Sequence, residues 1–299
     1  MNVESLLRKG KKIESKTSLG ILLGIAVKAD NEPLVQLLLD QHADVEARDV
    51  LRSTPLVLAV ARGYESIARL LLAHGADKDV RDKYDGMKPI ETAAYMGHEG
   101  LFRLLSDEAT RQTSSEKGKE IVDDQNIRVM RPLLITAAMG GNEAIVRNLL
   151  QQGADIEATI AEDIGVEPSM KGTKALIMAS AFGSQAAVRV LLEHGADPNA
   201  QSGDGTTALI AAAREDSPEI IDMLLQRGAN MEAADNIGST ALIAAAEQES
   251  PEIIDILLQR GANMEAADNS GSTALIAAAK EDYPETIDLL LQSSPNSCR

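Results

Sequence analysis

Histidine is the side chain best suited to acid–base chemistry near neutral pH, and this sequence has four of them. His74 and His194 both precede a Gly-Ala-Asp triplet, and His42 replaces the glycine of the same phrase one repeat earlier. A general base needs a partnered, partly desolvated imidazole in a cleft, whereas these positions are set by a recurring phrase. The pattern therefore favours a structural role for the histidines over a catalytic one.

The other reactive groups do not form catalytic or metal-binding motifs either. Asp235 and Asp268 are one whole repeat apart, which is not the close pairing of two glycosidase carboxylates. Residues 203–205 (Gly-Asp-Gly) lack the lysine or helix-opening glycine of a phosphate loop, and no serine occupies a Gly-x-Ser-x-Gly elbow. Neither Cys298, the single cysteine, nor the histidines show metal-ligand spacing. The sequence predicts no catalytic residue, metal or cofactor, and it favours a protein that is not an enzyme while leaving activity uncertain.

The elements that position these side chains must pack without large aromatic cores. The 299 residues include no Trp, two Phe and four Tyr, while Ala and Leu dominate the apolar fraction. Short side chains of this kind suit closely spaced helices. The composition predicts an all-α protein.

Charge is concentrated in the C-terminal third. The formal net charge is −17, and residues 201–291 hold 17 acids and 4 bases, a net −13 that leaves −4 for the remainder. This surface would repel nucleic acid and anionic membranes, so we expect neither as a partner, and it favours a partner with a basic surface. The alternative interpretation is that the acids only keep a Leu/Ala-rich array soluble.

No segment of the sequence predicts a membrane span or a signal peptide. The single cysteine, which allows no intrachain disulfide, fits a reducing compartment. We therefore expect an intracellular, cytoplasmic protein. Residues 8–12 (Arg-Lys-Gly-Lys-Lys) are typical of a solvated helix end, and a nuclear signal is the alternative.

A repeat of constant period organises the chain. Residues 205–237 and 238–270 differ at only 6 of 33 aligned positions, and 271–292 continue the same phrase. Each repeat is predicted to contain a turn, a short helix, a longer helix and an extended loop. One alanine marks the equivalent place in eight repeats: Ala26, Ala59, Ala93, Ala137, Ala179, Ala212, Ala245 and Ala278.

Turn and cap residues separate the elements inside each repeat. Residues 235–238 (Asp-Asn-Ile-Gly) supply a turn, and Thr54 and Thr240 are expected to cap the short helix. The longer helix is predicted to begin in the same way, at Ser217 and Ser250. Its apolar residues fall on one face, which a single repeat cannot bury alone.

The phrases at 70–77 (Leu-Leu-Leu-Ala-His-Gly-Ala-Asp) and 191–197 (Leu-Leu-Glu-His-Gly-Ala-Asp) resemble the ankyrin repeat, and the resemblance covers nearly the whole chain. It implies a solenoid of stacked helix-turn-helix units with β-turn or hairpin fingers, and it places His98 at a common histidine position of the family. The sequence departs from the family where an apolar residue replaces the histidine that stabilises the turn before the first helix. The replacements, which we expect to pack, are Val57, Ile177, Ile210, Ile243 and Ile276.

Longer spacing between marker alanines predicts two insertions. The first, 106–130, is rich in Ser, Thr, Glu and Lys and is predicted to be a flexible linker or finger, while the second, 159–172, is more apolar and is expected to fold back on the array. The predicted organisation is a half-repeat cap at 1–18, repeats 1–3 at 19–105, the first insertion, repeat 4 at 131–158, the second insertion, repeats 5–8 at 173–292 and a tail at 293–299. The half-repeat leaves open whether the chain is a piece of a longer array.

Sequence variation between the two most similar repeats falls mainly at the turns and at the end of the first helix. The resemblance implies that these positions line a concave, partner-binding surface. The predicted binding residues at these positions are Arg62, Tyr64, Tyr95, Met96, Met139, Phe182, Arg214, Glu215, Glu247, Gln248, Lys280 and Glu281.

Aromatic and methionine side chains gather in the first half of this set. Such residues are typical of binding hot spots, so Tyr64, Tyr95, Met96, Met139 and Phe182, covered by the two insertions, are predicted to form the principal site. The alternative is that the insertions only shield these residues from water.

These observations predict a protein-binding scaffold, adaptor or inhibitor. The alternative is a small-molecule-binding protein or a non-standard enzyme, with a pocket made by the aromatic and methionine residues and the two insertions. A minor third interpretation is that the chain is a substrate for hydroxylation, which the family resemblance implies for loop asparagines and which fits Asn199 best.

Overall fold

The computed structural model describes residues 16–83, 86–113, 124–159 and 172–293. It divides the chain into two compact units, unit 1 at Met1–Ile121 and unit 2 at Val122–Arg299. The half-repeat cap predicted at 1–18 lies almost wholly outside the described residues, as do most of the predicted tail and positions 160–171 of the second insertion.

Unit 1 consists of three successive helix pairs in its described part. The helices are α2 (Lys16–Lys28), α3 (Glu32–Asp40), α4 (Pro55–Ala61), α5 (Glu65–Ala73), α6 (Pro89–Met96) and α7 (Glu99–Thr113). The first helices, α2, α4 and α6, contact one another in order, and so do the second helices, α3, α5 and α7.

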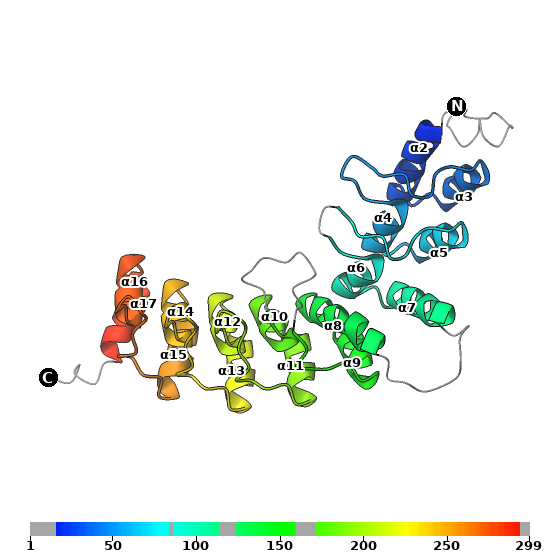
Figure 1. The fold of residues 1–299 in the computed structure, drawn as a ribbon. Coiled ribbons are helices and arrows are strands. Elements are labelled where there is room, and N and C mark those ends of the chain that lie inside the picture. Colours follow the sequence, from blue (N-terminus) through cyan, green and yellow to red (C-terminus); the bar gives the residue numbers. More distant parts are fainter. Residues whose placement is uncertain (1–15, 84–85, 114–123, 160–171, 294–299) are drawn as a thin grey trace. The chain divides into compact units, whose positions relative to one another are not determined.

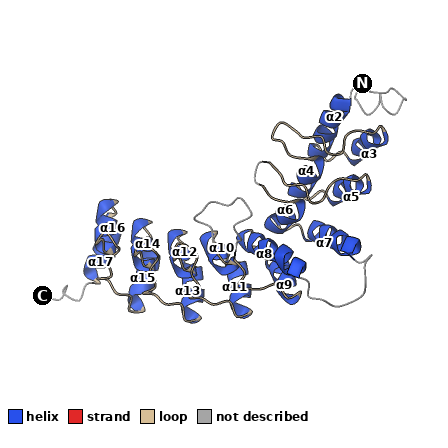
Figure 2. Ribbon diagram, in the orientation of Figure 1, coloured by secondary structure: helices blue, strands red, loops and turns tan. Residues whose placement is uncertain are grey.

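Unit 2 continues the pattern with five helix pairs (Figure 1). They are α8 (Asp124–Met139) with α9 (Glu143–Gln151), α10 (Ala175–Ala181) with α11 (Gln185–Glu193), α12 (Ala208–Arg214) with α13 (Pro218–Gln226), α14 (Ala241–Glu247) with α15 (Pro251–Gln259), and α16 (Ala274–Lys280) with α17 (Pro284–Gln292). First helices again pack on first helices and second helices on second helices. As Figure 2 shows, the described residues contain helices and loops, so the predicted all-α class is confirmed.

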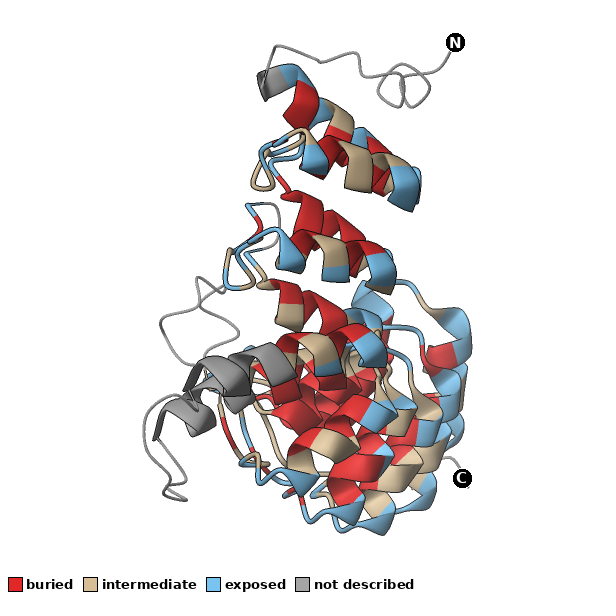
Figure 3. Cartoon of the chain, turned by 90° about the vertical axis from the view of Figure 1, so that its right-hand side faces the viewer, coloured by how far each residue is buried: buried red, intermediate tan, exposed pale blue. Residues whose placement is uncertain are grey.

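Each first helix carries its marker alanine in the core. All eight marker alanines are buried, and the leucine or isoleucine residues of the second helices pack beside them. Figure 3 shows buried residues on the helices and exposed ones mainly on loops and outer helix faces. Because alanine lets backbones approach closely, a short first helix can be covered by its neighbours on both sides.

The predicted threonine caps are confirmed, but the serine caps are not. The hydroxyl of Thr54 accepts a hydrogen bond from the backbone N–H of Val57, and Thr240 does the same for Ile243, both at 3.4 Å. Ser217 and Ser250 stand at the N-caps of α13 and α15, yet neither side chain makes a cap bond. The N-cap backbone differs between the two kinds of helix: ψ is 159° at Thr54 and 169° at Thr240, but 81° at Ser217 and 73° at Ser250, so the serines do not have the extended conformation of the threonine caps.

Four of the five apolar replacements of the family histidine are buried, as expected. Ile276 is the exception, with 43% of its surface exposed. It lies on α16 in the last described helix pair, where no further first helix packs on it.

The predicted flexible insertion at 106–130 differs from the structure at both of its ends. The helix α7 continues to Thr113, and α8 already begins at Asp124. Helical backbone therefore enters the segment from both sides, and residues 114–123 lie outside the described residues. A helix whose other turns are packed can extend into a polar segment, so composition alone does not set where these two helices end and begin.

A short finger precedes each of the last three first helices. Isolated antiparallel bridges close the fingers at Gln201–Thr207, Ala234–Thr240 and Ala267–Thr273. The glycine near the tip, for example Gly205 with φ of +81°, adopts the left-handed conformation that a tight turn requires. The fingers thus stand beside the first helices of unit 2.

Candidate binding surface

The predicted binding residues occupy one structural position in successive repeats. All except Tyr64 are the last two residues, the last residue or the C-cap of a first helix, and Tyr64 is the N-cap of α5. Helical side chains point back toward the helix N-terminus, so residues at this end reach toward the fingers. We call the fingers together with these helix ends the finger face.

The aromatic and methionine residues of the finger face are partly exposed, and they divide between the two units. Tyr64, Tyr95 and Met96 belong to unit 1, and Met139 and Phe182 belong to unit 2. Met96 is 50% and Phe182 43% exposed, and the other three are half-buried.

One hollow of unit 2 brings several predicted residues together. Phe182, Arg214 and Glu215 line it with Met178 and finger residues that include Thr206. Its volume of about 220 Å³ lies below the range of about 300–1,000 Å³ that is usual for small-molecule sites. The hollow is therefore better sized for a protruding side chain than for an enclosed metabolite.

Arg214 links the end of its helix to two fingers. One guanidinium nitrogen donates to Asp235 Oδ2 at 2.6 Å, and the other terminal nitrogen donates to Thr206 Oγ1 at 3.4 Å. Asp235 is fixed by its other oxygen, which accepts the backbone N–H groups of Ile237 and Ser239. The planar fork of arginine suits this double contact.

An equivalent contact between a cation at a helix end and an aspartate occurs in unit 1. Lys28, the last residue of α2, lies 2.7 Å from Asp49 Oδ2. Partial burial raises the pKa of the Asp49 carboxyl, but the hydrogen bond and charge of Lys28 and the backbone N–H groups outweigh it and leave the pKa below its ordinary value. A cation at the helix end that faces an aspartate of the following finger is thus a repeated device of the finger face.

The repeat after that of Arg214 lacks this ion pair, because Glu247 occupies the position equivalent to Arg214. Partial burial raises the pKa of the Glu247 carboxyl above its ordinary value, and the positive charge of Arg214 opposes the rise. The negative charges of Asp268, Asp235 and Glu281 raise the pKa further. Like charges therefore gather around Glu247.

Asp268 remains charged because its finger stabilises the carboxylate. The backbone N–H of Ser272 and the hydroxyl of Ser270 donate to its Oδ1 and lower the pKa of Asp268 below its ordinary value. The aspartate thus keeps its charge beside Glu247.

Asparagines join the finger tips of neighbouring repeats. The backbone N–H and side-chain amide of Asn236 donate to Asp204 O and Gly203 O, at 2.8 and 3.2 Å. Asn269 repeats both bonds toward Ile237 O and Asn236 O, each at 2.9 Å. The fingers of unit 2 are therefore held in a fixed row, so the finger face presents a preorganised surface.

Asn199 belongs to a second ladder, in the loops that follow the second helices. Its Oδ1 accepts the backbone N–H of Asn230 at 2.7 Å, and its Nδ2 donates to Gly228 O at 3.1 Å. Glu157 and Glu232 accept the equivalent backbone N–H groups in other repeats. Both ends of the Asn199 amide thus serve repeat stacking.

The histidines lie away from any metal-binding arrangement. His74 and His194 are the C-caps of α5 and α11, and each ring Nδ1 lies 2.8 Å from the carbonyl oxygen four residues earlier. Among the described residues, no three His, Cys, Asp or Glu side chains are grouped so that they would hold a metal ion.

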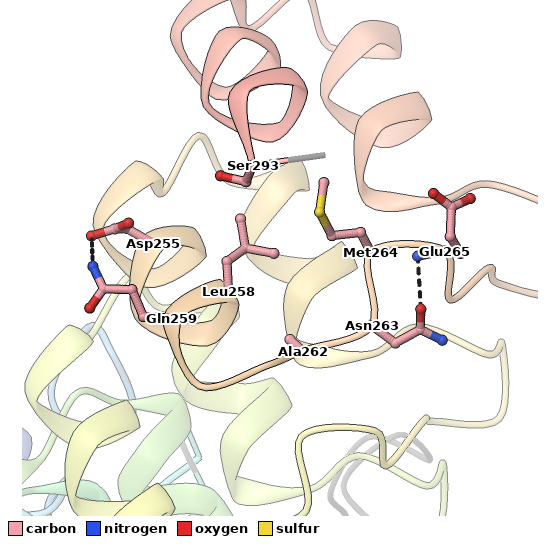
Figure 4. Close-up of a pocket in the computed structure, with 8 residues that line it drawn as sticks. All are labelled: Asp255, Leu258, Gln259, Ala262, Asn263, Met264, Glu265 and Ser293. Atoms are coloured by element: carbon pink, nitrogen blue, oxygen red, sulfur yellow. Dashed lines mark hydrogen bonds between the residues drawn. The ribbon is translucent and has the colours of Figure 1, made fainter. Parts of the chain in front are cut away.

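A second hollow of about 470 Å³ is lined by the end of α15, the loop that follows it and Ser293 (Figure 4). Its polar groups bond to one another: Asp255 accepts the side-chain amide of Gln259 at 2.6 Å, and Asn263 accepts the backbone N–H of Glu265 at 3.0 Å. None of the predicted binding residues lines this hollow.

The contact between Arg214 and Asp235 was not predicted from the sequence, and neither was a role for Ser239. The signal was present in the repeat alignment, because Lys28 and Arg214 precede Asp49 and Asp235 by the same spacing. Only stacking shows that this spacing brings the two side chains together.

Stacked helix pairs joined by hydrogen-bonded fingers define a repeat solenoid with an extended surface, and the comparisons identify its family. The family model for ankyrin repeats (3 copies) matches residues 23–117, 109–202, 134–235 and 209–298. The chain belongs to the ankyrin-repeat family. Ankyrin repeats generally mediate protein–protein interactions.

Curated relatives share this repeat across parts of much longer chains. The chain is similar to the ankyrin repeat and KH domain-containing protein mask-1 of Caenorhabditis elegans, with 30% identity over 57% of this chain and 6% of the relative. It is also similar to a transient receptor potential cation channel subfamily A member 1 homolog of the same species, with 30% identity over 34% of this chain and 8% of the relative. Protein phosphatase 1 regulatory subunit 12A of Mus musculus is 41% identical over 18% of this chain and 5% of its own length. The chain thus spans less than a tenth of each of these relatives.

No described helix combines the length and apolar character that a membrane crossing requires.

Proposed function

We propose that this chain is a protein-binding scaffold, adaptor or inhibitor that recognises a partner through its finger face, on the concave side of the repeats. The proposal rests on the positions of the substitutions between two nearly identical repeats. Between 205–237 and 238–270, the substitutions at the end of the first helix and at the finger tip are exposed or half-exposed, whereas the buried helix positions are almost unchanged. Such a pattern keeps the scaffold constant while its surface varies.

The physical character of this surface also supports protein recognition. Fingers held by asparagine hydrogen bonds form a row with little conformational freedom to lose on binding, and preorganisation of this kind favours rigid recognition. Exposed Phe182 beside Arg214 provides an anchor of the type found in interface hot spots. One relative, the phosphatase regulatory subunit, is by name part of an assembly.

A capture experiment tests the proposal. The immobilised chain would be exposed to a native extract, and bound proteins and metabolites would be identified by mass spectrometry. Two variants, Tyr95→Ala with Met96→Ala in unit 1 and Phe182→Ala in unit 2, probe the finger face separately. The control is Leu291→Ala, because Leu291 is 49% exposed on the second helix α17.

We expect a protein that binds the wild-type chain and the Leu291 variant but is lost from at least one finger-face variant. A metabolite lost from those variants, with no protein partner, would overturn the scaffold proposal and favour the small-molecule alternative.

A further inference from the structure

The Glu247 site, which we define as Glu247, Asp268 and Ser239, has the acceptors of a cation site without the cation. One repeat earlier, Arg214 donates to Asp235 Oδ2 and to Thr206 Oγ1. Asp268 and Ser239 occupy the equivalent positions one repeat later, and Glu247 replaces the arginine. The repeat thus conserves the two acceptors while it removes the donor.

Ser239 gives independent support for an absent ligand. Its side chain is buried, with 1% of the residue exposed, and its hydroxyl has no hydrogen-bond partner among the described residues. The equivalent hydroxyls, Thr206 Oγ1 and Ser272 Oγ, both receive a bond from a cation eight residues later, Arg214 and Lys280. Ser239 precedes Glu247 by the same eight residues, so its hydroxyl occupies the position that receives the cation in the two equivalent sites. A buried polar group left without a partner is costly, so it marks a place where a donor or acceptor from outside would be gained.

The two carboxylates complete the site. Asp268 uses Oδ1 for its own finger, as Asp235 does, and no hydrogen bond in the described part of the chain reaches its Oδ2. Glu247 likewise makes no side-chain hydrogen bond or ion pair with a described residue. The positive charge of Arg214 acts on its carboxyl, and so do the negative charges of Asp268, Asp235 and Glu281. The neighbouring cations are already engaged, Arg214 with Asp235 and Lys280 with Ser272.

We propose that the Glu247 site binds the guanidinium group of an arginine side chain presented by the protein partner. The inference rests on the proposed function, because it assigns a residue type to the partner of the same face. Arginine fits better than lysine because the fork of Arg214 reaches a hydroxyl and a carboxylate at once in the equivalent site. The incoming guanidinium takes the place equivalent to that of the Arg214 guanidinium, with one terminal nitrogen on Asp268 Oδ2, the other on Ser239 Oγ, and Glu247 beside its charge.

A titration with two capped tripeptides tests this site without a known partner. The probes are acetyl-Gly-Arg-Gly-amide and the same peptide with neutral citrulline in place of arginine. The backbone N–H signals of Ser270 and Ser272 serve as reporters in ¹H–¹⁵N spectra, because both groups donate to Asp268. We expect saturable shifts with the arginine peptide and at least tenfold weaker binding of the citrulline peptide.

Three variants make the result specific. Glu247→Arg supplies the cation from within the chain and should abolish the response. The fold accommodates an arginine at this position, because Arg214 occupies it one repeat earlier. Glu265→Arg makes the same charge reversal in the loop between α15 and the finger, where Glu265 lines the second hollow, and should retain the response. Ser239→Ala, which removes only the hydroxyl, should weaken binding several-fold and keeps the test available if Glu247→Arg does not fold.

The site would be disproved by an absent response to the arginine peptide, an equal response to citrulline, or a response that survives Glu247→Arg. A partner captured through Phe182 or Met96 but indifferent to Glu247→Arg would likewise overturn the arginine site, and it would leave the scaffold function standing.

Discussion

The side chains of Arg214 and Asp235 meet at 2.6 Å, where the end of α12 reaches the finger that leads into the next first helix, α14. The aspartate side chain is only 5% exposed, whereas the arginine is 36% exposed. The pair therefore joins α12 to the next finger on the finger face. The following repeat lacks the guanidinium donor, because Glu247 replaces the arginine there.

Replacing this arginine should weaken the stacking of the repeats. Arg214→Met keeps most of the apolar stem but removes both donors, and it should lower the free energy of unfolding by about 1 kcal/mol. Urea denaturation followed by circular dichroism measures the change. Arg260→Met is the matched control, because Arg260 pairs at 2.7 Å with Asp222, whose side chain is 44% exposed where that of Asp235 is 5% exposed. An equal loss in both variants would contradict a special role for the buried carboxylate.

The finger row predicts unequal effects for two glycines with the same backbone angle. Gly205 and Gly271 both have φ of +81°, but a Cβ at Gly205 would lie 2.8 Å from Asn236 Oδ1, whereas a Cβ at Gly271 would meet open space. Gly271→Ala should cost about 1 kcal/mol from backbone strain, and Gly205→Ala should cost about 2–4 kcal/mol because it also parts the fingers. Thermal unfolding of the two variants compares them. Similar losses would show that the contact between fingers adds nothing.

The turn inside each helix pair offers a stabilising substitution. Gly183 and Glu249 occupy the same position of their repeats, and both have positive φ, +63° and +53°. Glycine tolerates this conformation better, so Glu249→Gly should raise the free energy of unfolding by about 0.5–1 kcal/mol. Gly183→Ala should lower it by about 1 kcal/mol, since an added Cβ there meets only ordinary contacts.

The control for this turn is Asp288→Gly, in the middle of α17, which should lower stability by about 1 kcal/mol as glycine does inside a helix. If Glu249→Gly also lowered stability, the left-handed angle would not be a source of strain.

The charge of Glu247 predicts a pH-dependent stability. Because its folded-state pKa is raised above the ordinary value of 4.5, the charged form opposes folding, fully above the raised pKa and not at all well below 4.5. Glu247→Gln should therefore be more stable than the wild-type chain at pH 7, by no more than about 1 kcal/mol at this exposed position. The difference should shrink toward zero as the pH falls below 4.5.

Urea denaturation at a series of pH values measures this difference. Glu265→Gln, which removes one acid from the same repeat, controls for the change in net charge. A constant advantage of Glu247→Gln at every pH would argue against the raised pKa as its cause.

The sequence by itself determined the repeat, the helical class and the starts of the helices that Thr54 and Thr240 cap. The constant repeat period, the marker alanines and the threonine caps are readable without the structure, because a cap bond joins residues only three apart and an apolar stripe lies on one helix. The same locality explains why the apolar replacements of the family histidine were expected to pack.

Only the tertiary structure decided which side chains meet across repeats. It paired Arg214 with Asp235, left Ser239 without a partner, exposed Ile276 where the described array ends, and divided the predicted aromatic residues between two units. It also carried α7 and α8 into a segment whose composition predicted a flexible insertion. These outcomes depend on the register in which one repeat stacks on the next, and that register is set by the packing of many side chains together, so no local pattern encodes it.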